Sequence, residues 1–217
     1  MKKLLFIINP MAGRQQAQTD LYKMVKIFAD HDYEVTVYPT RARLDCTRKV
    51  LEDAGRFDLV VCCGGDGTLN EMVSGMMQRQ DRRPMGYIPL GSTNDLAVSL
   101  RLPTRVEEAA LRAVTGNEFH MDVGTLNDRY FNYIAAFGAF TETSYATPQE
   151  IKNALGHLAY ILEGVKSLGK ILPIHVKITA DDEQFEEDYL FGAVTNTISL
   201  GGVLKLDPEK VLLDDGM

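Results

Sequence analysis

The sequence lacks the features that would mark a secreted, membrane-spanning or nucleic-acid-binding protein. Its three cysteines (Cys46, Cys62 and Cys63) are an odd set, with two adjacent in an apolar run, which argues against a disulfide framework and against a metal site. The first apolar run, residues 4–8, is shorter than the roughly 7–15 residues of a signal-peptide core, and no run reaches the roughly 18 residues of a membrane span. The net charge of −7 argues against general nucleic-acid binding, which depends on neutralising phosphates. We therefore expect a cytoplasmic protein with no nucleic-acid partner.

Several common nucleotide-binding and catalytic motifs are absent too. The chain has no GxxxxGKS/T P-loop and no GxSxG nucleophile elbow. The spacing Gly65-x-Gly67-x-x-Asn70 places asparagine where a dinucleotide-binding fingerprint requires glycine. The four histidines show no spacing typical of metal ligands. These absences argue against a P-loop protein, a Rossmann dehydrogenase and an α/β-hydrolase.

The first half of the chain alternates apolar runs with helical patterns. With 217 residues and 45% hydrophobic content, the chain is long enough for one large domain or two small ones. Short all-apolar runs predict buried strands at residues 4–8, 33–38, 59–63 and 85–88. Helical spacing predicts helices at residues 21–28, 44–54, 68–78 and 106–114, and Gly55 and Gly116 end two of them. This alternation predicts a doubly wound, parallel α/β domain over residues 1–116.

The second half has a different pattern. Residues 119–126 and 130–139 flank the turn 127–129, and residues 171–179 and 185–195 flank the acidic turn 181–182, so each pair is predicted to form a β-hairpin. Residues 148–170 between the hairpins are predicted to be helical. We therefore predict a second, mostly antiparallel β domain over residues 117–217.

Three turns of unusual composition follow predicted strands. They are NPMAG (residues 9–13), GGDGT (64–68) and PLGSTND (89–95), and each combines glycine with small or polar side chains. Ligands of open α/β sheets bind beyond the carboxyl ends of the strands. Glycine lets backbone N–H groups approach a phosphate, and the helix that follows favours an anion at its N-terminus. The three turns therefore predict a phosphate-binding site.

Asp66 lies in the middle of the second turn. A carboxylate does not bind phosphate, so its presence there indicates a cation such as Mg²⁺ or a substrate hydroxyl that donates its proton to Asp66. Three structural alternatives remain open at this point. NPMAG could simply end a strand, GSTND could be a helix N-cap, and Asp66 could cap a helix that starts near Thr68.

The stretches NPMAG, GGDGTLNE and PLGSTND, in this order, resemble the catalytic domain of the diacylglycerol kinase family, in particular its soluble bacterial lipid kinases. The later segments FNYIAAFGA and NTISLGGVLKLDPEKVLLDDGM are also similar to the second domain of that family. The resemblance implies an ATP- and Mg²⁺-dependent kinase that phosphorylates a lipid hydroxyl, with conversion of diacylglycerol to phosphatidic acid as the expected reaction. It also implies that the second domain is a β-sandwich.

The chemistry of its turn makes Asp66 the expected catalytic residue. The resemblance assigns further roles to individual residues. Residues 212–217 resemble a structural Mg²⁺ loop, in which Asp215 would supply a carboxylate and Leu212 and Met217 backbone carbonyls. The expected nucleotide contacts are Asn9, Pro10, Met11, Ala12, Gly13, Thr40, Gly65, Asp66, Gly67, Thr68, Leu69, Asn70, Glu71 and Ser92.

The chain departs from the family pattern at one point. Family members continue well beyond the Asp215-Gly216 dipeptide, and the catalytic glutamate proposed for the bacterial members lies in that continuation. A sandwich without its last strands has open edges. We therefore expect this chain to be part of a longer protein, with an incomplete sandwich.

Other functions remain as alternatives. The GGDG turn is also similar to that of NAD kinases and phosphofructokinases, although PLGSTND favours the lipid kinases, and a non-catalytic nucleotide-binding regulatory module is a further alternative. The lipid is open between diacylglycerol, ceramide, undecaprenol-like alcohols and phosphatidylglycerol. The expected partner is a lipid at a membrane surface, and a homodimer is an open alternative. Basic side chains (Arg41, Arg43, Arg48 and Lys49) could touch anionic lipid, but a solvated helix face is favoured.

Overall fold

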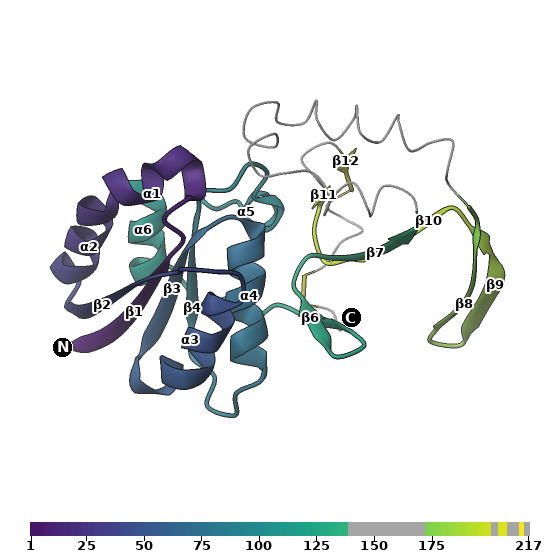
Figure 1. Cartoon of the computed structure of the whole chain (residues 1–217), viewed down its shortest axis with the longest axis horizontal. Coiled ribbons are helices and arrows are strands. Elements are labelled where there is room, and N and C mark those ends of the chain that lie inside the picture. Colours follow the sequence, from purple (N-terminus) through teal and green to yellow (C-terminus); the bar gives the residue numbers. More distant parts are fainter. Residues whose placement is uncertain (139–171, 201–203, 208–212, 215–217) are drawn as a thin grey trace. The chain divides into compact units, whose positions relative to one another are not determined.

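The computed structural model describes residues 1–138, 172–200, 204–207 and 213–214 (Figure 1). The chain divides into two compact units, one formed by Met1–Tyr133 with Asn196–Met217 and the other by Ile134–Thr195. The domain boundary expected near residue 117 stays a prediction.

The core of the first unit is a parallel four-stranded sheet with strand order β2-β1-β3-β4. Its strands are β1 (Lys2–Ile8), β2 (Tyr33–Pro39), β3 (Leu59–Gly64) and β4 (Met85–Pro89). Continuous apolar runs form the two central strands because both of their faces are covered, and every residue of β3 is buried. The four predicted strands are therefore confirmed, with ends that differ by one or two residues.

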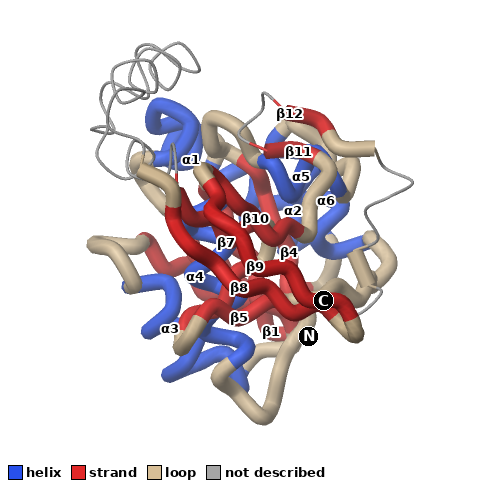
Figure 2. Tube along the Cα trace, turned by 90° about the vertical axis from the view of Figure 1, so that its right-hand side faces the viewer, coloured by secondary structure: helices blue, strands red, loops and turns tan. Residues whose placement is uncertain are grey.

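Helices cover both faces of this sheet (Figure 2). One face packs against α2 (Leu21–Asp30) and α6 (Val106–Thr115). The other face packs against α3 (Asp45–Asp53), α4 (Asp66–Met77) and the short α5 (Asp95–Ser99). The doubly wound α/β architecture predicted from the sequence is confirmed.

The three cysteines are buried in this unit as free thiols. Cys62 and Cys63 lie in β3, and Cys46 lies in α3. Burial raises the pKa of the Cys63 thiol to about 12, and it raises the pKa values of the Cys46 and Cys62 thiols as well. These thiols are therefore protonated core side chains at neutral pH.

Several helix boundaries differ from the predictions. α3 ends at Asp53, and the predicted stop at Gly55 lies within a 3-10 helix at Ala54–Arg56. α4 starts at Asp66, two residues earlier than predicted, because Gly65 takes the extended conformation of an N-cap. Short elements were missed, namely α5, a 3-10 helix at Ala12–Gln15 and α1 at Gln16–Thr19, because such elements carry too few residues for a periodic pattern.

The topology of the sheet predicts where a ligand binds. β1 and β3 are neighbours, but β1 leads to α2 on one face and β3 leads to α4 on the other. In open α/β sheets, such a switch between adjacent strands opens a crevice at their carboxyl ends. The turns that follow β1 and β3 are therefore at the expected ligand-binding position.

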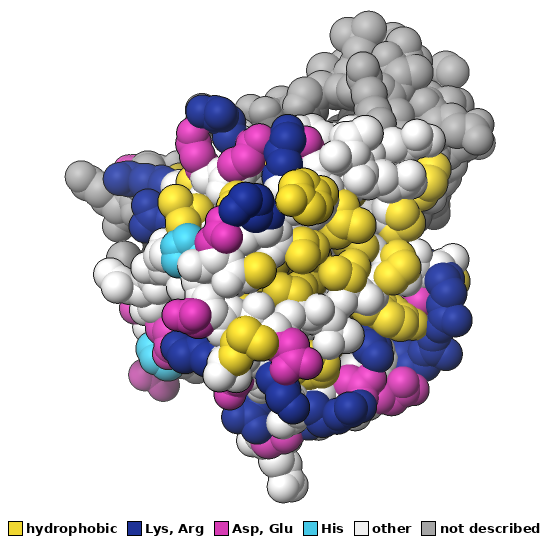
Figure 3. All heavy atoms as spheres, turned by 90° about the vertical axis from the view of Figure 1, so that its left-hand side faces the viewer, with side chains coloured by type: hydrophobic (Ala, Val, Ile, Leu, Met, Phe, Trp, Pro, Cys, Tyr) yellow, Lys and Arg dark blue, Asp and Glu magenta, His cyan; other side chains and the backbone are white. Residues whose placement is uncertain are grey.

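β2 is one of the two edge strands of the described sheet, and β4 is the other. Tyr33 and Val35 pack partly against the core of the α2 face, and Val37 is exposed. Figure 3 views this side of the first unit and shows hydrophobic side chains gathered there, with charged side chains around them.

The later strands are antiparallel, as predicted. In the first unit, β5 (Gly124–Leu126) pairs with β6 (Arg129–Phe131), and β11 (Ser199–Leu200) pairs with β12 (Leu204–Lys205). In the second unit, β7 (Ile134–Gly138) pairs with β10 (Phe191–Thr195), and β8 (Ile174–Ala180) pairs with β9 (Glu183–Tyr189). The stacking of such pairs into a sandwich stays a prediction.

Two predicted strands are each divided. Residues 130–139 were predicted as one strand, but β6 ends at Phe131 and β7 starts at Ile134 with a new partner, β10. Residues 185–195 were also predicted as one strand, and the chain breaks between β9 and β10 at Leu190. Both breaks occur where the strand changes partner, which a local pattern does not encode. The helix predicted at residues 148–170 lies outside the described residues.

No helix in the described part of the chain is long and apolar enough to cross a membrane.

Candidate active site

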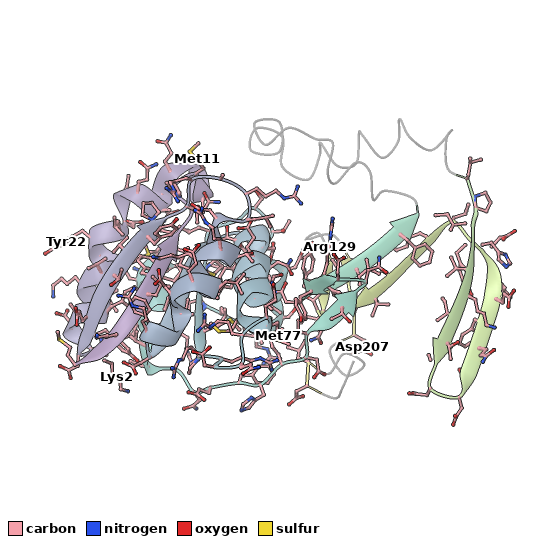
Figure 4. The ribbon with its side chains drawn as sticks, turned by 60° about the horizontal axis from the view of Figure 1, so that its bottom comes forward. Lys2, Met11, Tyr22, Met77, Arg129 and Asp207 are labelled. Atoms are coloured by element: carbon pink, nitrogen blue, oxygen red, sulfur yellow. The ribbon has the colours of Figure 1, made fainter. Side chains whose placement is uncertain are left out.

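The three glycine-containing turns meet at the carboxyl ends of the strands. The backbone N–H of Asn9, after β1, donates to the carbonyl of Cys63 in β3 at 2.9 Å. The backbone N–H of Leu90, after β4, donates to the carbonyl of Gly64 at 2.7 Å. The first and third turns are therefore each hydrogen-bonded to the end of β3, and the second turn lies between them. In Figure 4, Met11 marks the first turn, and Lys2 lies at the opposite end of β1.

Asn9 organises the first turn. Its Oδ1 accepts a hydrogen bond from the backbone N–H of Met11 at 3.0 Å, and its carbonyl accepts one from Ala12 at 3.1 Å. Its Nδ2 donates to Oγ1 of Thr68 at 3.4 Å, which links the first turn to the second. Gly13 has a φ of +60°, a conformation that favours glycine. NPMAG is therefore a shaped turn joined to GGDGT, and not only the end of a strand.

The glycines of the second turn serve different purposes. A Cβ at Gly64 would lie 2.5 Å from Oγ1 of Thr68, and a Cβ at Gly65 would lie 3.1 Å from the Cα of Gly91. Both positions need glycine because another part of the protein occupies the space. A Cβ at Gly67 would meet nothing within 4 Å. Only Gly67 leaves open space at the start of α4, where backbone N–H groups are free to bind an anion.

Asp66 is the first residue of α4 and makes no capping bond, because the N-cap is Gly65 and no side chain caps the helix. The interpretation of Asp66 as a helix cap is therefore wrong. One carboxylate oxygen, Oδ2, accepts a hydrogen bond from Oγ1 of Thr93 at 3.0 Å. The other, Oδ1, is buried and has no hydrogen-bond partner among the described residues. A buried acceptor without a partner costs about 1–3 kcal/mol, so this oxygen suits a cation or a hydroxyl donor.

The pKa of Asp66 is raised from its ordinary value. Burial is the main cause, since it disfavours the charged carboxylate, and the nearby charge of Asp95 acts in the same direction. The Thr93 hydroxyl and the backbone N–H groups of Leu96 and Asn94 oppose the shift. A raised pKa suits a group that accepts a proton near neutral pH.

The third turn is closed by its own side chains. Asn94 has a left-handed backbone (φ 51°, ψ 50°), and its side chain exchanges two hydrogen bonds with the backbone of Gly91, at 2.7 and 2.9 Å. Asn94 occupies the N-cap position of α5, as the capping interpretation of GSTND predicted, but its side chain makes no capping hydrogen bond. Ser92 is exposed on this turn, and Thr40 lies near the same edge of the sheet, where its backbone N–H donates to Ile8 at 2.9 Å.

Asp95 is a site residue that sequence reasoning missed. It is only 1% exposed, and its Oδ1 accepts a hydrogen bond from Oγ of Ser199 at 2.6 Å. Its carbonyl accepts from Thr197 at 3.3 Å and from Ser99 at 3.0 Å. These contacts join the third turn to residues 196–200. The signal for them is that both PLGSTND and NTISL belong to the stretches that resemble one family.

Some expected nucleotide contacts have other structural partners. The Leu69 side chain is buried in the core beneath α4. The carboxylate of Glu71 accepts a hydrogen bond from the backbone N–H of Leu44 at 2.9 Å, directly before α3. Asn70 donates to the carbonyl of Tyr130 at 3.4 Å. A role in nucleotide binding stays a prediction for these three residues.

The expected metal ligands Leu212, Asp215 and Met217 lie outside the described residues. The neighbouring Leu213 is described, and its carbonyl accepts hydrogen bonds from the backbone N–H of Asp122 at 2.8 Å and from Asn196 at 3.3 Å. Within the described ranges, no group of three or more His, Cys, Asp or Glu side chains could hold a metal ion. The Mg²⁺ loop stays a prediction, because its expected ligands lie outside the described residues.

Basic side chains near Thr40 are engaged by one carboxylate. Asp45 is buried, and it accepts hydrogen bonds from Arg41, Arg48 and the hydroxyl of Tyr38. The Arg41 guanidinium beside it is the main cause that lowers the pKa of Asp45 well below its usual range. The two arginines share one carboxylate, so this cluster keeps a net positive charge at the protein surface.

Known proteins match this chain along its whole length. The family model of the diacylglycerol kinase catalytic domain matches residues 3–126. A "Diacylglycerol kinase" of Bacillus subtilis is 37% identical over 219 residues, which cover 100% of this chain and 72% of that protein. A "Diacylglycerol kinase" of Staphylococcus saprophyticus is 32% identical and is covered to 70%. A crystal structure of a diacylglycerol kinase from Bacillus anthracis matches with a TM-score of 0.80 at 29% identity, over 99% of this chain and 70% of that one. The chain therefore belongs to the diacylglycerol kinase catalytic-domain family.

Proposed function

We propose that this chain transfers the terminal phosphoryl group of ATP to the hydroxyl group of diacylglycerol, with Mg²⁺, and so produces phosphatidic acid and ADP. In this reaction the lipid oxygen forms a bond to phosphorus, the bond between that phosphorus and the oxygen of ADP breaks, and the hydroxyl proton leaves to a base. Membership of the family supports a lipid kinase that uses ATP. The choice of diacylglycerol and the need for Mg²⁺ are our proposals.

The observation that carries the proposal is the position of Asp66. Its Oδ1 is buried without a described partner, at the start of α4 and beside the open space at Gly67. An acceptor oxygen next to an anion-binding helix terminus is the arrangement that phosphoryl transfer to a hydroxyl requires. Asp66 would accept the hydroxyl proton, and the free N–H groups at the start of α4 would hold the phosphates.

The residues present also fit a bound Mg²⁺. A carboxylate oxygen is a suitable ligand, so Oδ1 of Asp66 would either hold the ion or accept the hydroxyl proton. When bound, the ion would neutralise part of the phosphate charge, which otherwise repels the Asp66 carboxylate. Burial raises the pKa of Asp66, so without a bound ion the carboxylate is more basic than an exposed aspartate.

A lipid kinase without a described membrane-spanning helix must meet its substrate at the membrane surface. We propose transient peripheral contact, in which the positive charge of the Arg41–Asp45–Arg48 cluster is attracted by anionic lipid. The homodimer considered from the sequence stays a prediction.

One experiment tests the function and its alternatives. The protein is incubated with labelled ATP and Mg²⁺, in separate reactions with diacylglycerol, ceramide, phosphatidylglycerol and an undecaprenol-like alcohol in mixed micelles, and with soluble NAD. We expect label in phosphatidic acid, and none when Asp66 is replaced by Asn. Label in NAD alone would establish the soluble-hydroxyl alternative, and ATP binding with no labelled product would establish a regulatory module.

A further inference from the structure

Tyr87 makes a contact that the proposed mechanism does not use. It lies in β4 opposite Cys62 of β3, and its side chain is buried in the core on the α4 face, with 8% of the residue exposed. Its hydroxyl oxygen lies 3.3 Å from the carbonyl oxygen of Gly64 and 3.1 Å from Oδ1 of Asn94. Gly64 ends β3 and Asn94 precedes α5. The one proton of this hydroxyl is shared between two acceptors, so the hydroxyl contacts both the second and the third turn.

This bridge belongs to a closed ring of contacts around the candidate base. From Gly64 the chain runs through Gly65 to Asp66, whose carboxylate accepts the hydrogen bond from Thr93 at 3.0 Å. Thr93 is followed by Asn94, which returns to the Tyr87 hydroxyl. The position of Thr93 relative to Asp66 is therefore coupled to the Tyr87 bridge.

The Tyr87 hydroxyl restrains the separation of the second and third turns, and their backbone contact already limits their approach. The two turns already touch, since a Cβ built on Gly91 would lie 2.6 Å from the Cα of Gly65. They cannot move closer together, because their backbones are in contact. The Tyr87 hydroxyl opposes the remaining movement, which is separation of the turns.

The hydroxyl is a permanent donor. Burial is the main cause that raises the pKa of the Tyr87 phenol well above its usual value, and the charge of Asp66 adds to this effect. Both acceptors keep a second donor when the hydroxyl is removed, because Leu90 N–H donates to Gly64 and Gly91 N–H donates to Asn94. Loss of the hydroxyl therefore leaves neither the Gly64 carbonyl nor Oδ1 of Asn94 without a donor.

We propose that the Tyr87 hydroxyl is a positioning group for phosphoryl transfer, which holds the second and third turns together and so keeps Thr93 against the Asp66 carboxylate. It acts through Thr93 and not by contact with a substrate. The inference rests on the proposed function, because its effect is measured on that reaction.

The test compares Tyr87→Phe, Thr93→Val and the double variant with the unchanged protein. The phenylalanine fills the same space in the core and removes only the hydroxyl. Tyr33→Phe is the matched control, because it removes a phenol hydroxyl at the opposite end of the same sheet. For each protein we measure kcat, the KM values for ATP and lipid, ATP affinity by calorimetry, and Tm.

We expect Tyr87→Phe to lower kcat about tenfold, since small misplacements of reacting groups are costly, while both KM values and the ATP affinity change less than about threefold. Thr93→Val should lower kcat to a similar extent, and the double variant should be no slower than Thr93→Val alone, because the two act on one contact. Tyr33→Phe should retain normal kinetics. If the hydroxyl had a purely structural role, Tyr87→Phe would lower Tm but would not lower kcat while leaving the KM values nearly unchanged.

Two results would overturn the inference. One is a kcat of Tyr87→Phe within about twofold of the unchanged protein. The other is a double variant whose losses multiply, since Tyr87 would then act independently of Thr93. If the unchanged protein phosphorylates no lipid in the same assay, the proposed function fails instead, so the two failures are distinguishable.

Discussion

Thr93 donates a hydrogen bond of 3.0 Å to one oxygen of the Asp66 carboxylate, while the second oxygen of Asp66 is buried without a partner among the described residues. The two oxygens of one side chain therefore have different roles. The first is fixed by the protein, and the second is available to a ligand. This division explains why a carboxylate can lie within a turn whose backbone is suited to phosphate.

The first prediction concerns turnover. Asp66→Asn keeps an acceptor for Thr93 but removes the negative charge and the base, so kcat should fall by at least about 10²-fold. ATP affinity should change far less, because the backbone of the turn is unchanged. Steady-state kinetics and calorimetry check both values. The control is Asp30→Asn, since Asp30 is exposed at the end of α2 and forms an ion pair with Lys26. Near-normal turnover of Asp66→Asn would leave Asp66 without a catalytic role.

The second prediction concerns the stability of the same variant. The pKa of Asp66 is raised in the folded protein, so the folded state binds this proton more tightly than the unfolded state. The carboxyl therefore stabilises the fold at low pH, and this stability is lost as the pH rises through the folded pKa. At pH 7 the ionised form is unfavourable, so Asp66→Asn should have a higher Tm than the unchanged protein. The difference should shrink as the pH falls toward about 4, the ordinary range of an aspartate.

Thermal unfolding at several pH values checks this prediction. An Asp66→Asn variant that is less stable than the unchanged protein at pH 7 would contradict it. That result would indicate that the folded protein stabilises the ionised Asp66 carboxylate.

The third prediction separates the glycines of the second turn. Gly67→Ala should retain or slightly raise stability, because alanine is favoured over glycine in helices by about 1 kcal/mol and its Cβ meets no protein atom within 4 Å. Its ATP affinity should nevertheless fall by about tenfold or more, because the Cβ enters the space proposed for phosphate.

Gly65→Ala is the contrasting variant, since its Cβ would press on the Cα of Gly91 at 3.1 Å and should lower Tm. Calorimetry and thermal unfolding of the two variants check the pair. Unchanged ATP binding by a folded Gly67→Ala protein would show that phosphate does not lie at this position.

The fourth prediction concerns Mg²⁺. If the loop at residues 212–217 holds a structural ion, added Mg²⁺ should raise the Tm of the unchanged protein, and Asp215→Ala should lose this gain. Asp214→Ala is a suitable comparison, because Asp214 is the adjacent carboxylate and has no assigned role. An equal Mg²⁺-dependent gain in Asp215→Ala would show that the ion binds elsewhere.

Sequence patterns correctly predicted the elements whose formation depends mainly on their own residues, such as buried strands and glycine-rich turns. The apolar run around Val60 and Val61 predicted a strand buried on both faces, and β3 is such a strand. The glycines around Asp66 predicted a turn that something approaches closely. The sequence did not distinguish Gly64 and Gly65, which make room for Thr68 and Gly91, from Gly67, which faces open space. That difference depends on neighbours that are distant in the sequence.

Long-range contacts explain the other differences. Ser199 hydrogen-bonds to Asp95 across 104 positions, and no periodicity or spacing encodes such a pair. The predicted strands break at residues 132–133 and at Leu190. These breaks arise because β7 and β10 pair with each other and not within the two predicted hairpins. Sequence patterns describe what a segment can form, and pairing decides which neighbours it meets.

The burial of all three thiols has a practical consequence. Reagents such as maleimides react with exposed thiolates, and Cys46, Cys62 and Cys63 are buried with pKa values raised by that burial. A cysteine introduced at the exposed Arg82, just before β4 at the end of the sheet opposite the turns, would therefore be the preferred reactive position without removal of the native cysteines. Energy transfer between a fluorophore attached there and a fluorescent ATP analogue would report on nucleotide binding, while the ends of β1, β3 and β4 stay unmodified.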